Sequence, residues 1–394
     1  MRQMLIVAKL LFIILIVSSC KTKRPSPLTT EIPSHALNFE NKSWSIKAAT
    51  FNVRALPVKS PKAKKRMGLT GVEIDRLKID IIGMQEAFIT RGKKNLLKNT
   101  ALKHSHFFKV PGTLGSGNFI VSKTPVSDPT FYYHLLLGPL KNIEGWSGKG
   151  IGKVNTTHKK LPISFFNVHL LARRGRDANR WQDNNSIDRL IEIFEVFSQI
   201  VEQTESDAFI LAGDFNMNMH NLEYAFFKNL TSLKGTLIQE NRNECTFCEN
   251  NTFNNHEEGQ LDYIWVSPRL KIDSSKIVFK SPIRIKHEMM NLSDHFGILS
   301  DISINQNKYI DPATVRLKTT QQIDWLYHRT KRYLQRNYSN EKSVAEKFCR
   351  KCRIKDTLDH LKLYKMALSG NKTLSKKESI IKRRLDSYFS LFSN

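Results

Sequence analysis

Residues 209–216 read Phe-Ile-Leu-Ala-Gly-Asp-Phe-Asn, an apolar run that ends in polar residues. The run predicts a buried strand, and Gly213 marks its end. Residues two apart on an extended backbone point the same way, so Asp214 and Asn216 can face one pocket. An acid or base beside a neutral amide donor is one interpretation, and a solvated turn is the alternative.

Polar residues end an apolar run at five other places in the chain. These fragments are Thr50-Phe51-Asn52-Val53, Gln85-Glu86, Asn167-Val168-His169-Leu170, Leu261-Asp262-Tyr263-Ile264 and Ser293-Asp294-His295. Together with the first fragment they offer carboxylates, amides and two histidines, which suit a divalent metal, a phosphate and an activated water. One such fragment carries little information, but six in one chain are hard to assign to packing alone.

Two pairs of these residues suggest specific chemistry. The carboxylate of Glu86 should lie at a strand end near Asn52, and such oxygen ligands suit Mg²⁺. Asp262 lies inside an apolar strand, where a charge is costly unless it is paired. We predict His295 as its partner, because a carboxylate orients an imidazole ring and raises its basicity. The alternatives are a surface position for Glu86 and a structural role for the histidine.

Strands and helices are interspersed along the chain, which predicts a layered α/β fold. Strands are expected at residues 46–53, 79–84, 119–121, 163–170, 209–212, 264–266 and 296–304, helices at 71–78 and 187–201, and a basic loop at 59–66. The helix at 187–201 has an apolar face, as packing on a sheet requires. From about residue 305 the pattern becomes basic and helical, which predicts a small helical C-terminal appendage.

The chain is strongly basic, with a formal net charge of +26 over 394 residues. Such a charge suggests an anionic partner, either nucleic acid, an acidic membrane surface or a polyphosphate; a solvated basic surface is the alternative. Residues 305–394 hold 21 Lys and Arg against 8 Asp and Glu, a net of +13. Half of the excess therefore follows the last polar fragment, so charge and chemistry are partly separable.

The first 20 residues have the pattern of a targeting segment. Residues 10–17 form an apolar run that is short for a membrane span, and Arg2 and Lys9 precede it. Ser18-Ser19-Cys20 resembles a bacterial lipobox, although Val17 stands where Leu is usual; a secretory signal is the alternative. We expect an exported protein, either lipid-anchored at the outer membrane or periplasm or secreted, with 21–44 as a flexible tether.

Four further cysteines form two C-x-x-C pairs, Cys245/Cys248 and Cys349/Cys352. Two such pairs can supply a Cys₄ zinc site, but these pairs lie about 100 residues apart, unlike a compact zinc ribbon. Disulfides formed in an oxidising compartment are the favoured interpretation. A zinc site and free thiols are the alternatives.

The six fragments together resemble the signature of the endonuclease/exonuclease/phosphatase superfamily of metal-dependent phosphodiesterases. The resemblance covers residues 45–304 and implies a catalytic domain there, folded as a four-layered α/β sandwich, with 305–394 outside it. It also implies that Glu86 and Asn52 hold a catalytic Mg²⁺, or alternatively Mn²⁺. Asp294 is implied as a ligand to a second metal or as a positioning residue.

The same resemblance assigns roles to the remaining polar residues. His295, paired with Asp262, would act on the attacking water. Asp214 would assist proton transfer, and Asn216 would hold the phosphate. His169 would stabilise the charged transition state.

Within that superfamily, the chain is most similar to neutral sphingomyelinases. Residues 144–152, Glu-Gly-Trp-Ser-Gly-Lys-Gly-Ile-Gly, resemble their Trp-x-x-Gly-Lys-Gly element. This likeness implies phospholipase C-type hydrolysis of sphingomyelin or a related phospholipid, with a membrane surface as partner. The alternative is an exported Mg²⁺-dependent nuclease, supported by the basic charge and by arginines at 173, 174, 176 and 180. A non-catalytic binding module is a third reading, and no obligate protein partner is evident.

Overall fold

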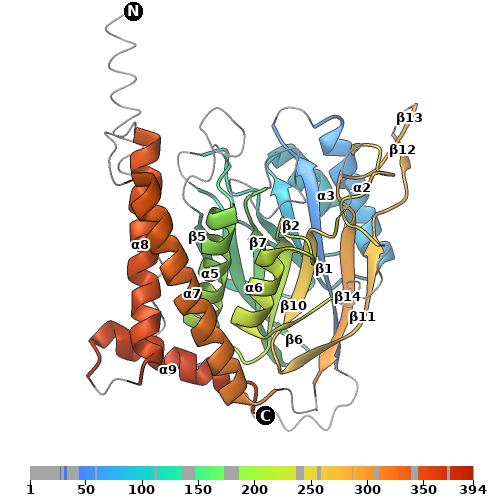
Figure 1. The fold of residues 1–394 in the computed structure, drawn as a ribbon. Helices are drawn as coiled ribbons and strands as arrows, with labels where there is room; N and C mark the ends of the chain where they lie inside the picture. The colour runs from blue at the N-terminus through green and yellow to red at the C-terminus, as the bar shows by residue number, and fades with distance from the viewer. Residues whose placement is uncertain are drawn as a thin grey trace, which may run out of the picture.

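Two six-stranded sheets form the centre of the computed structural model (Figure 1). The first has the order β11 (Leu270–Val278), β14 (Gly297–Ile304), β1 (Ser45–Ala55), β2 (Ile81–Ala87), β4 (Phe119–Ser122), β3 (His104–Phe107). The second has the order β5 (Val126–Tyr133), β6 (Gly150–His158), β7 (Leu161–His169), β8 (Phe209–Asp214), β10 (Asp262–Val266), β9 (Lys234–Gly235). A small hairpin of β12 (Ile283–Ile285) and β13 (Glu288–Met290) completes the strands.

The structure describes most of the chain from residue 44 onward. The described residues are 27, 31–32, 44–57, 60–110, 113–134, 147–172, 186–236, 244–254, 259–285, 287–305, 310–338, 345–370 and 373–393. The predicted signal segment with Cys20, most of the predicted tether and the arginines at 173–180 lie outside these ranges. Among the described helices, none combines the length and the apolar character that crossing a membrane would require.

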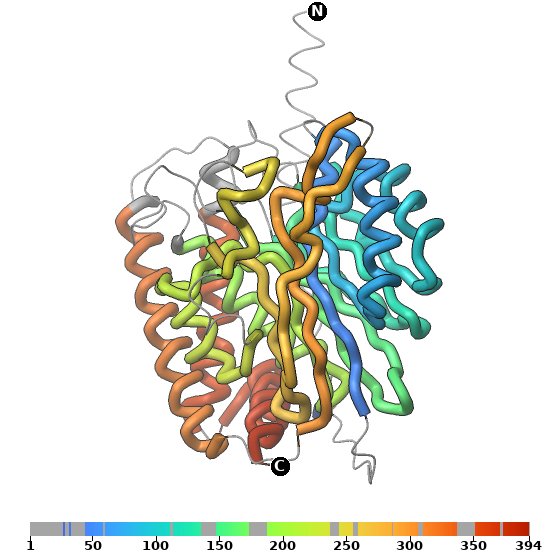
Figure 2. The backbone as a smooth tube through the Cα atoms, turned by 90° about the vertical axis from the view of Figure 1, so that its right-hand side faces the viewer, coloured from blue at the N-terminus to red at the C-terminus, as the bar shows by residue number. Residues whose placement is uncertain are grey.

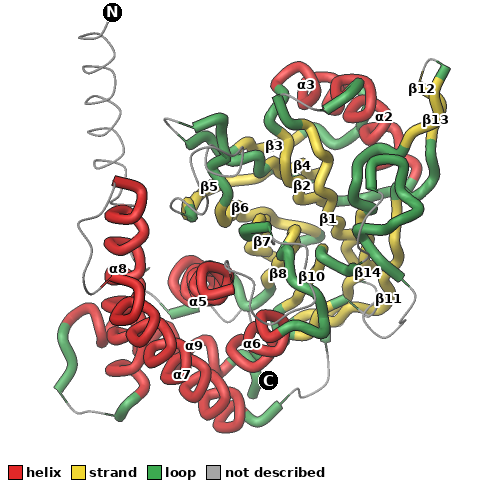
Figure 3. The backbone as a smooth tube through the Cα atoms, turned by 45° about the horizontal axis from the view of Figure 1, so that its top comes forward, coloured by secondary structure: helices red, strands yellow, loops and turns green. Residues whose placement is uncertain are grey.

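The two sheets pack face to face, and helices cover both outer faces (Figure 3). Residues such as Ile81, Phe165 and Ile210 fill the space between the sheets. The other face of the first sheet packs on α2 (Ala63–Arg76) and α3 (Thr90–Lys98). The outer face of the second packs on α5 (Ser186–Gln203) and α6 (Leu222–Thr231). Successive side chains of a strand point to opposite faces of the sheet, so both faces of each sheet are buried in this way. The predicted four-layered sandwich is confirmed.

Helix α2 differs from the prediction, which placed a loop at 59–66 and a helix at 71–78. The helix begins at Ala63 and its buried residues include Arg66, Met67 and Thr70. This spacing is helical, but it is hidden in the sequence because one member of the buried face is an arginine. Arg66 donates to the carbonyls of Val53 (3.0 Å), Arg54 (2.7 Å) and Leu292, so its charge is buried with hydrogen-bond partners.

Three C-terminal helices lie against α5 and α6: α7 (Pro312–Tyr338), α8 (Ala345–Leu368) and α9 (Lys376–Ser390). Leu361, Tyr364 and Tyr388 belong to the same apolar core as the second sheet. Glu202 of α5 accepts a hydrogen bond from Tyr364 Oη (2.9 Å) and pairs with His360 (2.8 Å). The helical character of 305–394 agrees with the sequence, and the boundary at 304 stays a prediction. The shared core indicates that the helices are held firmly to the sandwich.

The first C-x-x-C pair forms an internal disulfide between Cys245 and Cys248, whose Cα atoms are 5.5 Å apart. Cys352 is a free thiol, and the side chain of Cys349 lies outside the described part. Sulfurs bonded to each other cannot act as zinc thiolates, so the four-cysteine zinc alternative is wrong. The favoured disulfide interpretation is confirmed for Cys245 and Cys248, and it is wrong for Cys352, where the free-thiol alternative holds.

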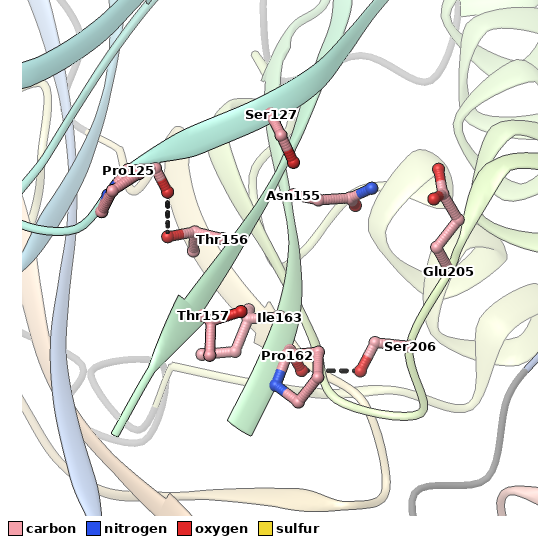
Figure 4. A pocket seen from close by; sticks show the side chains of 9 residues that line it. All are labelled: Pro125, Ser127, Asn155, Thr156, Thr157, Pro162, Ile163, Glu205 and Ser206. Carbon is pink, nitrogen blue, oxygen red and sulfur yellow. Dashed lines mark hydrogen bonds between the residues drawn. The ribbon is translucent and has the colours of Figure 1, made fainter. Parts of the chain in front are cut away.

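A pocket of about 450 Å³ lies where β6 ends and β7 begins (Figure 4). Thr156 Oγ1 donates to the Pro125 carbonyl (2.7 Å) and Ser206 Oγ to the Pro162 carbonyl (2.6 Å). These hydroxyls are therefore committed to the fold. The polar fragments lie at the opposite end of β7, so this pocket is separate from the candidate site.

Candidate active site

The polar fragments meet because the strands beside them begin or end at one edge of the sandwich. β1 runs parallel to β2, with Asn52 opposite Gln85, and β7 runs parallel to β8, with His169 opposite Asp214. β10 is antiparallel to β8 and begins at Asp262, opposite Asp214. The carboxyl ends of parallel strands share an edge, so residues distant in sequence become neighbours.

Gly213 allows Asp214 to reach this position. A Cβ atom at Gly213 would lie 2.1 Å from the carbonyl oxygen of Val168 on β7. Such a contact is impossible without moving the backbone of the neighbouring strand. The glycine before the acid is therefore required by the close approach of β7 and β8.

His295 and Asp262 form the pair that the sequence suggested. Nδ1 of His295 lies 2.9 Å from Oδ2 of Asp262, and its Nε2 lies 3.8 Å from Oδ2 of Asp214. Burial lowers the pKa of His295, but the two carboxylates outweigh it and raise the pKa to about 10. The ring centroid of Phe247 lies 5.1 Å from that of the imidazole ring. The histidine is thus oriented by Asp262 with its other nitrogen directed to Asp214.

Asp214 is the hub of the site. Its Oδ2 accepts a hydrogen bond from Asn52 Nδ2 (3.0 Å) and lies 3.6 Å from Nε2 of His169. Its Oδ1 accepts from the backbone N–H of Asn216 (3.0 Å). Burial raises the pKa of Asp214 to about 6, against the attraction of His295. A carboxyl poised near neutral pH can take part in proton transfer.

His169 is fully enclosed and uncharged. Burial, followed by the positive charges of Lys149 and His295, holds its pKa well below the usual range. Neither ring nitrogen forms a hydrogen bond to another described residue. A neutral imidazole with a spare donor is suited to contacting a ligand, because an unsatisfied buried group gains a partner on binding.

Glu86 and Asn52 lie together at the ends of β2 and β1. Glu86 has a left-handed backbone with φ of 55°, a conformation that non-glycine residues adopt at a cost and that clusters at functional sites. Desolvation and then the charge of Asp294 raise the pKa of Glu86 to about 7, although a hydrogen bond with Asn52 opposes this. Asp294 is paired with Nη1 of Arg54 at 2.7 Å, which favours positioning for Asp294 over metal binding.

The donor set of this site suits a divalent cation. Ligand atoms of Asp214, Asp262 and His295 all lie within 4.8 Å of one another. The buried Oδ1 of Asp262 has no hydrogen-bond partner among the described residues. Glu86 lies close enough to Asp214 for Asn52 to hydrogen bond with both carboxylates. Closely spaced buried carboxylates repel one another unless a cation neutralises them.

Lys149 belongs to the site, although the sequence singled it out only as part of the Gly-Lys-Gly element. Its Nζ donates to the Leu170 carbonyl (3.3 Å), and its charge opposes the desolvation that raises the pKa values of Glu86 and Asp214. Asn216 Nδ2 donates to the same carbonyl (3.0 Å), which leaves its second N–H for a ligand. The sequence could not show that Lys149 reaches the site, because this depends on the pairing of β6 with β7.

A polar layer beneath the site joins the two sheets. Gln85 Nε2 donates to Asn167 Oδ1 (2.6 Å), and Asn167 Nδ2 donates to the Met84 carbonyl (2.9 Å). Asn118 Nδ2 donates to the Asn167 carbonyl (3.1 Å). These amides fix the distance between the strand ends that carry Glu86 and the second sheet. Sequence reasoning missed Asn118, because an asparagine after a Gly-Ser-Gly turn is ordinary.

Comparison with known proteins places this geometry in context. A family model for the Endonuclease/Exonuclease/phosphatase family matches residues 49–295, which contain all the predicted site residues. A Drosophila melanogaster protein described as a putative neutral sphingomyelinase is 24% identical over 275 residues, covering 65% of this chain. The match spans 60% of that relative's length.

Two solved structures share the fold. Sphingomyelinase C from Streptomyces griseocarneus is 14% identical with a TM-score of 0.53, over 66% of this chain and 99% of the other. A beta toxin mutant from Staphylococcus aureus, with bound magnesium ions, is 17% identical with a TM-score of 0.52, over 65% and 99%. At these identities the likeness establishes the fold alone.

Proposed function

The chain belongs to the endonuclease/exonuclease/phosphatase family, and on that premise we propose that it is an exported Mg²⁺-dependent phosphodiesterase. Its substrate in this proposal is sphingomyelin or a related phospholipid, cleaved in the manner of phospholipase C. The hydrolase class follows from the family. The metal, the lipid, the export and the anchoring at Cys20 belong to the proposal.

The observation that carries the chemistry is the buried array of Asp262, His295 and Asp214. Asp262 holds Nδ1 of His295 at 2.9 Å, so the outward nitrogen Nε2 handles the proton. With both carboxylates charged, the raised pKa keeps the imidazole protonated. A cation held beside Asp214 would lower the pKa of His295, so that its Nε2 could accept the proton of the attacking water.

Glu86 and Asn52 are the residues that would hold Mg²⁺, and Asn52 also donates to the neighbouring carboxylate of Asp214. Oxygen donors that leave room for water and a phosphate oxygen are what this ion prefers. When bound, the ion polarises the phosphate and stabilises its developing negative charge. Asp294 stays with Arg54 and steadies the segment before His295.

The phosphate would lie between Lys149, the free N–H of Asn216 and His169. Lys149 offers a full positive charge, and the other two offer neutral donors in a site largely closed to water. Donors fixed before the reaction stabilise a charged transition state at little reorganisation cost. Asp214, near both histidines, can pass a proton toward the leaving group.

A phospholipid substrate is supported by two similar proteins, which are described as a putative neutral sphingomyelinase and a sphingomyelinase C. It is also consistent with the expected export and lipid anchor, which would keep the enzyme near a membrane. The match spans 60% of that relative's length, so the substrate is part of the proposal.

The deciding experiment compares sphingomyelin vesicles with plasmid DNA at the same enzyme concentration, with Mg²⁺ and with excess EDTA. We expect Mg²⁺-dependent release of phosphocholine, abolished by EDTA and restored by added Mg²⁺. His295→Ala serves as the inactive control. Full activity in EDTA would refute the metal, and cleavage of DNA without lipid hydrolysis would replace the lipid by nucleic acid.

A further inference from the structure

Helices α2 and α3 carry an excess of basic side chains. α3 has the sequence Thr-Arg-Gly-Lys-Lys-Asn-Leu-Leu-Lys, with four basic residues and no acidic one. α2 begins Ala-Lys-Lys-Arg directly after Lys62. Neither helix has an acidic residue in its first turn. This arrangement opposes the helix dipole, which favours acidic residues at the amino end, so local helix stability does not explain it.

Four exposed basic side chains in the first halves of the two helices form what we call the basic rim: Lys64, Lys65, Arg91 and Lys94. Among the described residues, no carboxylate pairs with any of them, whereas Lys62 beside them pairs with Glu288 at 2.7 Å. The rim is therefore a patch of uncompensated positive charge. It is contributed by two helices that pack side by side.

The C-terminal helices use their charge differently. Arg316 and Lys382 share Asp386, Lys365 pairs with Asp324, and Arg353 is buried against Glu195. Part of the +13 of this segment is thus consumed in holding the helices to each other and to α5. Half of the chain's excess charge lies in this segment, and these ion pairs leave fewer of its cations available to an anionic partner.

The basic rim lies at the same end of the sandwich as the candidate active site. α2 follows the carboxyl end of β1 and α3 follows the carboxyl end of β2, so both helices begin where Asn52 and Glu86 lie. The C-terminal helix α7 lies on the other side of the molecule from α2 and α3 (Figure 2). A flat anionic surface that reaches the active site would meet the rim first.

We propose that the basic rim docks on the anionic headgroups of a phospholipid bilayer and presents the active-site end to the lipid. This inference rests on the proposed phospholipase function, because a lipid substrate must be reached at the bilayer surface. Among the described residues, no hydrogen bond or ion pair joins a rim side chain to a site residue, so we assign the surface adsorption rather than chemistry. Exposed lysines and arginines attract anionic lipid without needing a shaped pocket.

The size of the effect follows from the number of charges. Each Lys or Arg near an anionic surface contributes about 1 kcal/mol at moderate salt, and every 1.4 kcal/mol is about tenfold. Removing four such charges should weaken adsorption by about 100- to 1,000-fold. The attraction should fall with salt, because exposed charges are screened within about 10 Å at 0.1 M.

The test uses the full chain with the rim neutralised as K64Q, K65Q, R91Q and K94Q together. The matched control removes four exposed charges from α7 as K318Q, K331Q, R332Q and R336Q. Adsorption is measured by co-sedimentation with vesicles of phosphatidylcholine alone and of phosphatidylcholine with phosphatidylserine. Turnover of a soluble phosphodiester is measured in parallel, and thermal unfolding verifies that each variant is folded.

We expect the rim variant to lose about 100-fold or more in adsorption to the anionic vesicles while keeping its turnover of the soluble ester. The α7 control should lose less than about tenfold, because α7 lies on the other side of the molecule (Figure 2) and its charges are not near the docked surface. Equal losses in both variants, or unchanged adsorption of the rim variant, would overturn the proposal. The proposal would also be overturned if the rim variant adsorbed normally to vesicles but lost binding to duplex DNA. An inactive but vesicle-binding wild type would contradict the proposed function and leave the docking surface standing.

Discussion

Replacing Arg353 by methionine tests whether the C-terminal helices are an integral part of the folded sandwich. Arg353 lies in α8, and its Nη2 is 3.1 Å from Oε2 of Glu195 in α5. Glu195 also accepts from Tyr132 Oη (3.0 Å) and pairs with His134 (2.7 Å). The substitution keeps much of the volume but leaves buried carboxylates without their cation.

The expected cost is set by the charges left behind. Removing one partner of a buried ion pair costs about 3–5 kcal/mol. Glu195 keeps its contacts with His134 and Tyr132, so we expect the lower end, about 3 kcal/mol. Burial already raises the pKa of Glu192, against the attraction of His134 and then Arg353. Loss of Arg353 should therefore raise that pKa further. Glu192 also accepts from the backbone N–H of Leu171 (2.8 Å), which links α5 to the segment that follows β7.

The assay is equilibrium unfolding in guanidinium chloride, followed by tryptophan fluorescence and by far-ultraviolet circular dichroism. Arg332→Met, at an exposed position of α7, is the control and should change stability by less than about 0.5 kcal/mol. A loss below about 1 kcal/mol in Arg353→Met would refute the reasoning. Two separate transitions in the wild type would show instead that residues 305–394 unfold on their own.

Four further outcomes are expected. His295→Ala should lower kcat by at least about 10²–10⁴-fold with the fold intact; retention of a tenth of the rate would remove it from the mechanism. Because the pKa of Glu86 is raised to about 7, its protonated carboxyl stabilises the folded protein when no cation is bound. This stabilisation is present at low pH and is lost as the pH rises through about 7. Calorimetry should thus show Mg²⁺ affinity rising about tenfold per pH unit below that pKa, and a flat profile would contradict it. Arg66→Met should lower kcat and should lower the free energy of unfolding by about 3 kcal/mol. Arg66→Lys should regain part of both losses. An unchanged kcat in Arg66→Met would limit Arg66 to a structural role. Truncation after Ile304 should give an aggregating protein, because it exposes the apolar face of α5 and α6. A soluble, active product would show instead that residues 305–394 are separable from the catalytic domain.

Much of the fold was readable because its signals are local. The helix predicted at 187–201 corresponds to α5, since its apolar face repeats with helical spacing. The strand predicted at 209–212 is β8, because an uninterrupted apolar run buries both faces of a central strand. The basic start of α2 was misread as a loop, because a buried arginine that satisfies itself on backbone carbonyls looks like surface charge in the sequence.

The site shows the same division. The chemical types were visible in short fragments, and the pairing of Asp262 with His295 followed from the cost of an unpaired charge inside a strand. Lys149 and Asn118 could not be identified, because their neighbours at the site come from other strands. Their role depends on strand register, which hydrogen bonding between distant segments sets.

By itself, the sequence determined the layered α/β class, the set of reactive groups and the location of the excess positive charge, because these depend on composition and on short-range periodicity. Only the tertiary structure decided which charges remain available. It paired the C-terminal cations with acids, buried Arg66 and Arg353, and left the basic rim of α2 and α3 without carboxylate partners among the described residues. The physical reason is that the energy of a charge depends on its neighbours in space and on its access to water.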